Sequence, residues 1–227
     1  PNGAVVRAAL IGSGLAARLP KGALVVDMSS SRPTDTIALA RELSAMGLDV
    51  VDAPVSGGVK RAAEGSLAIM AGGEADAVAR ARPLLAALGK SIIHTGPIGS
   101  GHAMKALNNY VSAAGLVAAC EALRVGARFG IDPTVMTDVL NVSTGRNNST
   151  EVKLKPFVIS QSYDSGFAMA LMAKDLGIAA DLAQELDLDL PQIGALARLW
   201  REASHALGPS ADHTEIDRYL GGARAPK

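Results

Sequence analysis

The sequence predicts an α/β region followed by an all-α region. Between residues 23 and 98, short apolar runs rich in Val, Ile and Leu alternate with segments of helical periodicity, as in strands separated by helices. From residue 101 onward the periodicity is helical almost throughout. The 227 residues suffice for one large domain or two small ones with an ample core.

The α/β region contains four expected strands. They cover residues 23–27, 48–53, 67–72 and 91–95, and helices are expected over 34–46 and 75–88. Strands that alternate with helices favour parallel pairing. Four strands make a small sheet, because helices must cover both of its faces.

The all-α region opens with its longest helix, over residues 101–129. This segment contains no proline and ends at Gly130, with Pro133 shortly after. Further helices are expected over 133–141, 149–160, 168–186 and 192–207. We expect the first helix to join the two regions, and its alanine-rich surface suits close packing either within its own domain or against a second subunit.

One glycine pattern, Gly12-x-Gly14-x-x-Ala17, has the spacing of a dinucleotide-binding loop. Such a loop needs a buried strand before it and a crossover helix after it. The preceding segment has helical spacing with Arg7 in its middle, and too few residues follow for a crossover. We therefore expect a surface helix that ends at glycine and leads into the strand at 23–27.

Composition excludes several classes of function. The 22 basic and 22 acidic residues cancel, and seven aromatic residues leave few stacking platforms, so neither nucleic acid nor a membrane is an expected partner. Cys120 is the only cysteine and is expected in the core, which favours a reducing, cytoplasmic location. The four histidines show no metal-ligand spacing, so no metal is expected.

Ser56, Gly57 and Gly58 follow a predicted strand. Ligands in open α/β sheets bind beyond the carboxyl ends of strands. A hydroxyl next to two glycines, whose backbone N–H groups are unobstructed, can bind a carboxylate through hydrogen bonds. The alternative is a plain glycine turn.

Lys105 and Asn109 are four residues apart, so on a helix they share one face. Their neighbours are apolar, and a lysine buried there must be paired or lose its proton, which makes Lys105 a candidate acid/base group. The alternative is a lysine that extends to solvent at the helix edge. Lys174 and Asp175 interrupt a strongly apolar helix, which indicates either a cleft or an internal salt bridge.

Four motifs in this order resemble the β-hydroxyacid dehydrogenases, which include 3-hydroxyisobutyrate dehydrogenase and tartronate semialdehyde reductase. The segment DMSSSRP (27–33) is similar to the family's D-x-S-T-x-x-P segment, with Ser30 in the threonine place. Residues 52–58 resemble its substrate loop, residues 101–109 its G-x-x-x-K-x-x-N-N helix, and Lys174-Asp175 its K-D pair. The resemblance extends over essentially the whole chain.

The resemblance implies a role for each motif. Lys105 would be the general acid that protonates the substrate oxygen as hydride arrives, and the base in the reverse direction. Ser56, Gly57 and Gly58 would bind the substrate carboxylate, and Asn109 would hold the substrate or Lys105. Ser30 and Lys174 would contact the cofactor, NAD or NADP. A small carboxylate substrate and a homodimer or homotetramer are expected.

Two departures from the family pattern qualify this expectation. Asn108 stands where the related 6-phosphogluconate dehydrogenases carry histidine, which disfavours a sugar-phosphate substrate. The family also opens with about 70 further residues that hold its phosphate loop. We therefore expect residues 1–98 to be the C-terminal half of a Rossmann-like NAD(P)-binding domain, without its first strands and phosphate loop. Residues 99–227 would then form an all-helical dehydrogenase domain built on a long interdomain helix.

A second hypothesis from another class stays open. A catalytically silent oligomerisation or binding module derived from the same family would also have an alanine-rich helix and no phosphate loop. The complete set of Ser56, Lys105, Asn109 and Lys174 favours the oxidoreductase.

Overall fold

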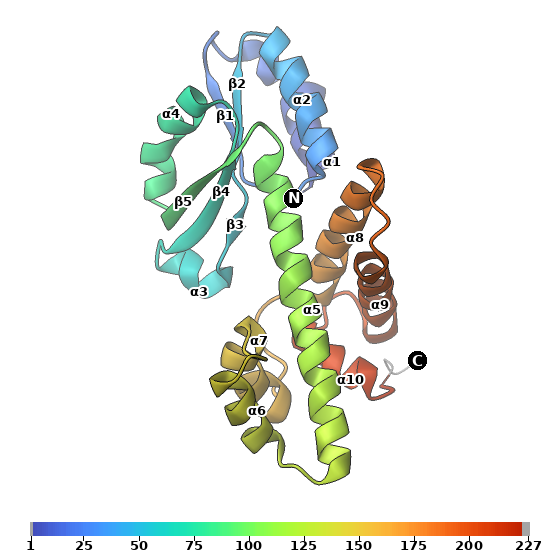
Figure 1. Cartoon of the computed structure of the whole chain (residues 1–227). Coiled ribbons are helices and arrows are strands. Elements are labelled where there is room, and N and C mark those ends of the chain that lie inside the picture. Colours follow the sequence, from blue (N-terminus) through green and yellow to red (C-terminus); the bar gives the residue numbers. More distant parts are fainter. Residues whose placement is uncertain (1, 224–227) are drawn as a thin grey trace. The chain divides into compact units, whose positions relative to one another are not determined.

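A five-stranded mixed sheet forms the centre of the N-terminal part of the computed structural model, which describes residues 2–223 (Figure 1). Its strands are β1 (Leu24–Asp27), β2 (Asp49–Asp52), β3 (Val55–Ser56), β4 (Leu67–Gly72) and β5 (Gly89–Gly96). The pairs β1–β2 and β4–β5 are parallel, as expected.

β4 runs antiparallel to β2 and β3, a pairing that the sequence did not predict. Asp52 pairs with Gly72 and Val55 with Ile69, so β2 and β3 follow one continuous register along β4. The chain returns through the short helix α3 (Gly58–Ala63) instead of crossing over the sheet. A return of this kind reverses the strand direction, and hydrophobic periodicity carries no information about that direction.

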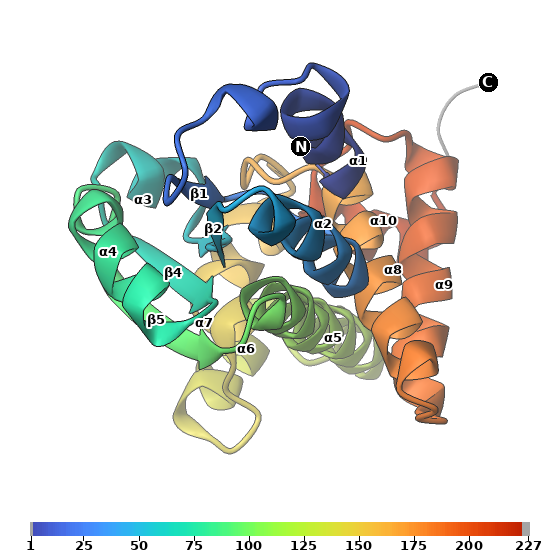
Figure 2. The ribbon, with the colours of Figure 1, turned by 90° about the horizontal axis from the view of Figure 1, so that it is seen from above.

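Helices cover both faces of the sheet. Val26 and Val51 pack on the side of α4 (Ala75–Ala86), whereas Val25 and Val50 pack on the side of α2 (Pro33–Ala45). This alternation follows from the two-residue period of a strand. Figure 2 shows α2 and α4 on opposite sides of the strands.

The Gly12–Ala17 pattern follows a helix, as the sequence predicts. Helix α1 (Gly3–Arg7) continues into the π-helix η1 (Ala8–Gly12), and a single 3-10 turn, η2 (Ala16–Arg18), precedes β1. Gly14 has a φ of 72°, the left-handed conformation common just past a helix end. These glycines therefore end a helix and lead into β1.

Helices make up the rest of the chain. They are α5 (Ser100–Phe129), α6 (Pro133–Val142), α7 (Asn148–Val152), the π-helix η3 (Leu154–Ile159), α8 (Met169–Glu185), α9 (Pro191–Leu207), the 3-10 turn η4 (His213–Glu215) and α10 (Ile216–Leu220). The chain divides into two compact units, Pro1–Leu107 and Asn108–Lys227, and the division lies within α5.

The helix expected over 149–160 is two helices. Regular α-helix stops at Val152, and the N–H of Val158 then bonds to the carbonyl of Lys153, five residues back. Pro156 lacks an N–H group and cannot continue the i to i−4 ladder, which accounts for the change in winding. The short helices η4 and α10 are absent from the sequence prediction.

The core of the second unit forms around one side of α5. Leu116 and Cys120 are fully buried there, together with Trp200 and Leu176 from two other helices. Burial raises the pKa of the Cys120 thiol to about 12, consistent with a packing role. By length and composition alone α5 could cross a membrane, a test that the core helix of a globular protein also passes.

Candidate active site

Ser30 lies just beyond the carboxyl end of β1. There the carboxylate of Asp27 accepts the N–H of Ser29 at 2.9 Å, and the hydroxyls of Ser29 and Ser31 are 2.6 Å apart. A cavity of about 420 Å³ adjoins this strand end. It is lined mainly by apolar side chains, and its lining is Val5, Val6, Ala9, Leu10, Val25, Val26, Asp27, Met28 and Ser29.

Ser56, Gly57 and Gly58 form a strand-to-helix turn in which the glycines are exposed and Ser56 is half-buried. Ser56 pairs with Ala68 of β4, and the two glycines, with φ of 141° and 68°, lead into α3. A Cβ at Gly57 would lie 2.7 Å from the side chain of Arg61, so glycine is required by contact as well as by φ. The turn therefore presents a hydroxyl beside backbone that carries no side chain.

Asp52 fixes the start of α5. It is the last residue of β2 and is fully buried, and its carboxylate accepts the N–H of Gly99 and the N–H of His102, both at 2.7 Å. N–H groups in the first turn of a helix have no partner within it, and a negative charge is favourable at that end. One carboxylate thus acts as the cap of the helix that carries Lys105.

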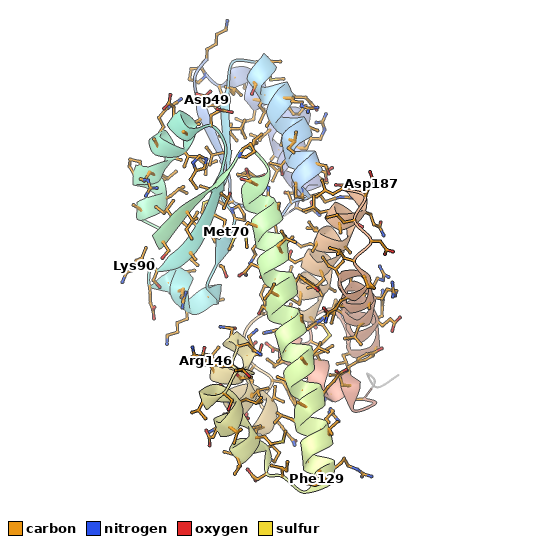
Figure 3. All side chains as sticks on the ribbon, viewed as in Figure 1. Asp49, Met70, Lys90, Phe129, Arg146 and Asp187 are labelled. Carbon is orange, nitrogen blue, oxygen red and sulfur yellow. The ribbon has the colours of Figure 1, made fainter. Side chains whose placement is uncertain are left out.

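Two glycines allow α5 to begin directly against the sheet. A Cβ at Gly101 would lie 2.4 Å from the carbonyl oxygen of Met70, which is labelled in Figure 3, and 2.8 Å from that of Asp52. A Cβ at Gly72 would lie 2.4 Å from the carboxylate of Asp52. The first turn of α5 is therefore held in van der Waals contact with β2 and β4.

Lys105 and Asn109 lie one turn apart on α5, as predicted. Both are buried, with 9% and 6% of their surfaces exposed. Lys105 belongs to the first unit and Asn109 to the second.

Asp175 is a buried carboxylate that holds Asn109. The Nδ2 of Asn109 donates to Asp175 Oδ2 at 2.6 Å, and Asn109 Oδ1 accepts from Asn108 Nδ2 at 3.2 Å. Asp175 Oδ1 lies 3.1 Å from Lys174 Nζ, an ion pair outside hydrogen-bond geometry. Lys174 and Asp175 therefore form an ion pair in which the carboxylate is buried and the lysine side chain is 31% exposed.

The predicted site residues divide between the units. The first unit carries Ser30, the 56–58 turn and Lys105, whereas the second carries Asn109 and Lys174. Sequence reasoning did not identify the roles of Asp52 and Asp175. The signal that could have found them is the same for both: a carboxylate within an apolar run must find partners.

Two family models together match most of the chain. Residues 1–96 match the NAD binding domain of 6-phosphogluconate dehydrogenase, and residues 99–220 match the NAD-binding domain of NADP-dependent 3-hydroxyisobutyrate dehydrogenase. A curated relative, 2-(hydroxymethyl)glutarate dehydrogenase from Eubacterium barkeri, is 35% identical over 92% of this chain and 69% of its own length. The chain belongs to the 3-hydroxyisobutyrate dehydrogenase family.

Other members of this family agree with the assignment. Mitochondrial 3-hydroxyisobutyrate dehydrogenase from Mus musculus is 35% identical over 92% of this chain and 64% of its own length. The solved structure of 3-hydroxyisobutyrate dehydrogenase from Mycobacterium tuberculosis with L-serine has a TM-score of 0.89 and 31% identity, and the match covers 97% of this chain and 77% of that one. The chain spans about two thirds of the length of these curated relatives.

The comparisons confirm the predicted family, the class of enzyme and the combination of an α/β part with a helical part. The matched models are NAD-binding domains of dehydrogenases, and the related structure of Psf3, at 28% identity and a TM-score of 0.80, contains NADP+. The expected cofactor class of the family, NAD or NADP, is confirmed as well.

Proposed function

We propose that this protein transfers hydride between NAD(P) and a small 3-hydroxy acid or semialdehyde acid, with Lys105 as the general acid and base. The observation that carries the proposal is the arrangement at the carboxyl edge of β1 and β2. Ser30 follows β1, the 56–58 turn follows β2 and β3, and Asp52 at the end of β2 holds the helix that bears Lys105. Ligands of open α/β sheets bind at this edge.

The cofactor fits the chemistry of this edge. The cavity beside β1 is mainly apolar and ends at the polar residues that precede Ser30, which suits a flat ring with a polar substituent. In our proposal Ser30 and Lys174 contact the cofactor. Bound NAD(P) would supply or accept the hydride.

The residues of the chain supply the proton and bind the substrate. The ammonium group of Lys105 donates its proton to the substrate oxygen during reduction and takes it back during oxidation. Ser56 and the N–H groups of Gly57 and Gly58 bind the carboxylate. Asn109, fixed by Asp175, orients the oxygen that reacts or Lys105 itself.

The names of the relatives define a substrate class. They are dehydrogenases of 2-(hydroxymethyl)glutarate, 3-hydroxyisobutyrate and L-serine. Each of these molecules carries a hydroxymethyl group on the carbon next to a carboxylate. We propose that the substrate of this protein shares that 3-hydroxycarboxylate unit.

Replacement of Lys105 tests the acid/base role. We expect Lys105→Ala to reduce kcat by at least about a thousandfold while the dissociation constant for NAD(P)H changes little, because the lysine acts on the substrate oxygen. Turnover and NAD(P)H binding are measured on the purified 227-residue chain. Lys21→Ala, on an exposed turn, is the control. Turnover within tenfold of wild type in Lys105→Ala would reject the role of Lys105.

The alternative, a catalytically silent module, predicts a different result. Such a module would form oligomers and give no turnover with any 3-hydroxy acid. The buried Lys105 and the Asn109 amide that Asp175 holds favour the enzyme, because buried polar groups cost stability and a silent module has no chemistry that requires them.

We propose in addition that a second copy of the chain covers apolar stripes on α5 and α6. The stripes recur at helical spacing, and each side chain is more than half exposed: Val111, Val125, Phe129, Val135, Val139 and Val142. We expect light scattering to report a dimer or tetramer, and Val139→Glu together with Val142→Glu to shift it toward the monomer. A monomer already in the wild-type chain would refute the proposal.

A further inference from the structure

We infer that His102 is a positioning residue that couples the segment carrying Ser30 to the start of the helix carrying Lys105. The inference rests on the proposed function for the meaning of Ser30 and Lys105. The coupling itself rests on contacts within the first unit alone.

The imidazole of His102 is almost fully buried and bridges three segments. Its Nε2 lies 3.1 Å from the carbonyl oxygen of Ser29, just beyond β1, and its Nδ1 lies 2.8 Å from the hydroxyl of Thr36 on α2. Nδ1 is also 3.7 Å from the carboxylate of Asp52 at the end of β2. Ser29, Thr36 and Asp52 are themselves buried.

The chemistry of these contacts assigns the hydrogens. A carbonyl oxygen can only accept, so Nε2 of His102 carries the hydrogen and donates it to Ser29. Nδ1 is then left to pair with the hydroxyl of Thr36, which also lies 3.1 Å from the carbonyl oxygen of Arg32. One ring thus satisfies two buried polar groups that come from segments 66 and 73 residues away in the chain.

The main chain of the same residue is held as well. The N–H of His102 donates to Asp52, so its backbone is fixed to β2 while its ring is fixed to the segment after β1. Lys105 lies three residues later, one helical turn away, and Ser30 directly follows Ser29. A shift of either segment would strain the bond between Nε2 and the Ser29 carbonyl, so the two positions are mechanically linked.

The position requires a side chain with a donor toward the Ser29 carbonyl and a second polar group toward the Thr36 hydroxyl. Glutamine has both, whereas leucine fills similar volume and has neither. Thr36→Val removes only the hydroxyl partner and leaves the histidine in place. His205, exposed on α9, offers a matched control in His205→Leu.

The test measures backbone hydrogen exchange and steady-state kinetics on these four variants of the full chain. We expect His102→Leu to raise exchange at residues 28–31 about tenfold or more beyond any global change, because the Ser29 carbonyl loses its partner. We expect kcat to fall about tenfold or more with a smaller change in the substrate KM. His102→Gln restores most of both, Thr36→Val gives an intermediate change, and His205→Leu changes neither.

The two measurements separate the inference from the proposed function. A wild-type protein without turnover defeats the proposed function, and hydrogen exchange still decides whether His102 holds the segment after β1. The inference is overturned if the rate of hydrogen exchange at residues 28–31 is the same in Thr36→Val and His102→Leu as in His205→Leu. If His102→Leu does not fold, the other two variants decide. The inference is also overturned if Thr36→Val exchanges at residues 28–31 as the wild type does, or if His102→Gln restores neither the exchange rate nor kcat.

Discussion

At the scale of single residues, Lys153 carries a partly buried charge that costs stability. It lies between α7 and η3, with its Nζ 3.3 Å from the hydroxyl of Ser112, and burial lowers the pKa of its amine to about 8. The amine titrates near 10.5 when the chain unfolds. Between these values the unfolded chain binds more protons, so stability rises with pH from about 8 to about 10.5.

Lys153→Met should therefore stabilise the chain at pH 7, where the folded state must bury a cation. We expect the free energy of unfolding to rise by about 1–3 kcal/mol at pH 7. The difference from wild type should shrink between pH 8 and 10.5. Urea unfolding at a series of pH values measures it, and a difference that is independent of pH would contradict the explanation.

Asp212 shows the opposite case, a carboxylate that stabilises the fold. It accepts the N–H of Gly166 and of Thr214 at 2.9 Å and the hydroxyl of Ser165 at the same distance. The bonds from His213, Thr214 and Ser165 outweigh burial and lower its pKa well below the usual range. Because the folded pKa is depressed, this stabilisation is complete above about pH 4 and is lost as pH falls toward the folded value.

Asp212→Asn should cost about 2–3 kcal/mol at pH 7, because the amide offers one acceptor oxygen instead of two. The loss should diminish as the pH is lowered below 4, because the carboxylate takes up a proton in the unfolded wild-type chain there and the wild type loses this stabilisation. Asp187→Asn, an exposed position labelled in Figure 3, is the control and should change little. An equal loss at pH 3 and pH 7 would argue against the charged carboxylate.

At the scale of secondary-structure elements, the contact between the start of α5 and the sheet depends on glycine. Gly101→Ala would place a methyl group against two backbone oxygens that cannot move without disturbing β2 and β4. We expect a loss of about 2–4 kcal/mol in the free energy of unfolding. Gly177→Ala on α8 is the matched control: nothing lies within 4 Å of the added Cβ, so helix propensity should stabilise it by up to about 1 kcal/mol. A Gly101→Ala chain as stable as wild type would show that α5 begins farther from the sheet.

The elements themselves could largely be predicted from the sequence. β1, α2, α4 and α9 follow the apolar periods closely, because each buries one regular face. The direction of β4, the switch to π-helix at η3 and the short helices η4 and α10 could not be predicted, since they depend on tertiary pairing or on a single proline. The spacing of residues along the chain predicted the site motifs. The hydrogen bonds of Asp52 and His102 join residues that are 47 to 73 positions apart, and no local sequence pattern predicts such contacts.

At the scale of the whole molecule, the proposed site residues occur in both compact units. The 56–58 turn and Lys105 belong to the first unit, and Asn109, whose amide Asp175 holds, belongs to the second. Arg146, labelled in Figure 3 on the second unit, is 64% exposed and pairs only loosely with Glu151, so it contributes to neither set in our account.

Deuterium transfer from the cofactor to the product measures the proposed hydride transfer itself. The protein is incubated with NADH or NADPH deuterated at C4, in separate samples for the two faces of the ring, and with a small semialdehyde acid. We predict that one face gives a 3-hydroxy acid with one deuterium on the carbinol carbon, detected by mass spectrometry, and that Lys105→Ala gives none. Product without deuterium from either face, or no product from any 3-hydroxycarboxylate precursor, would contradict the assignment of this protein as a hydride-transferring dehydrogenase.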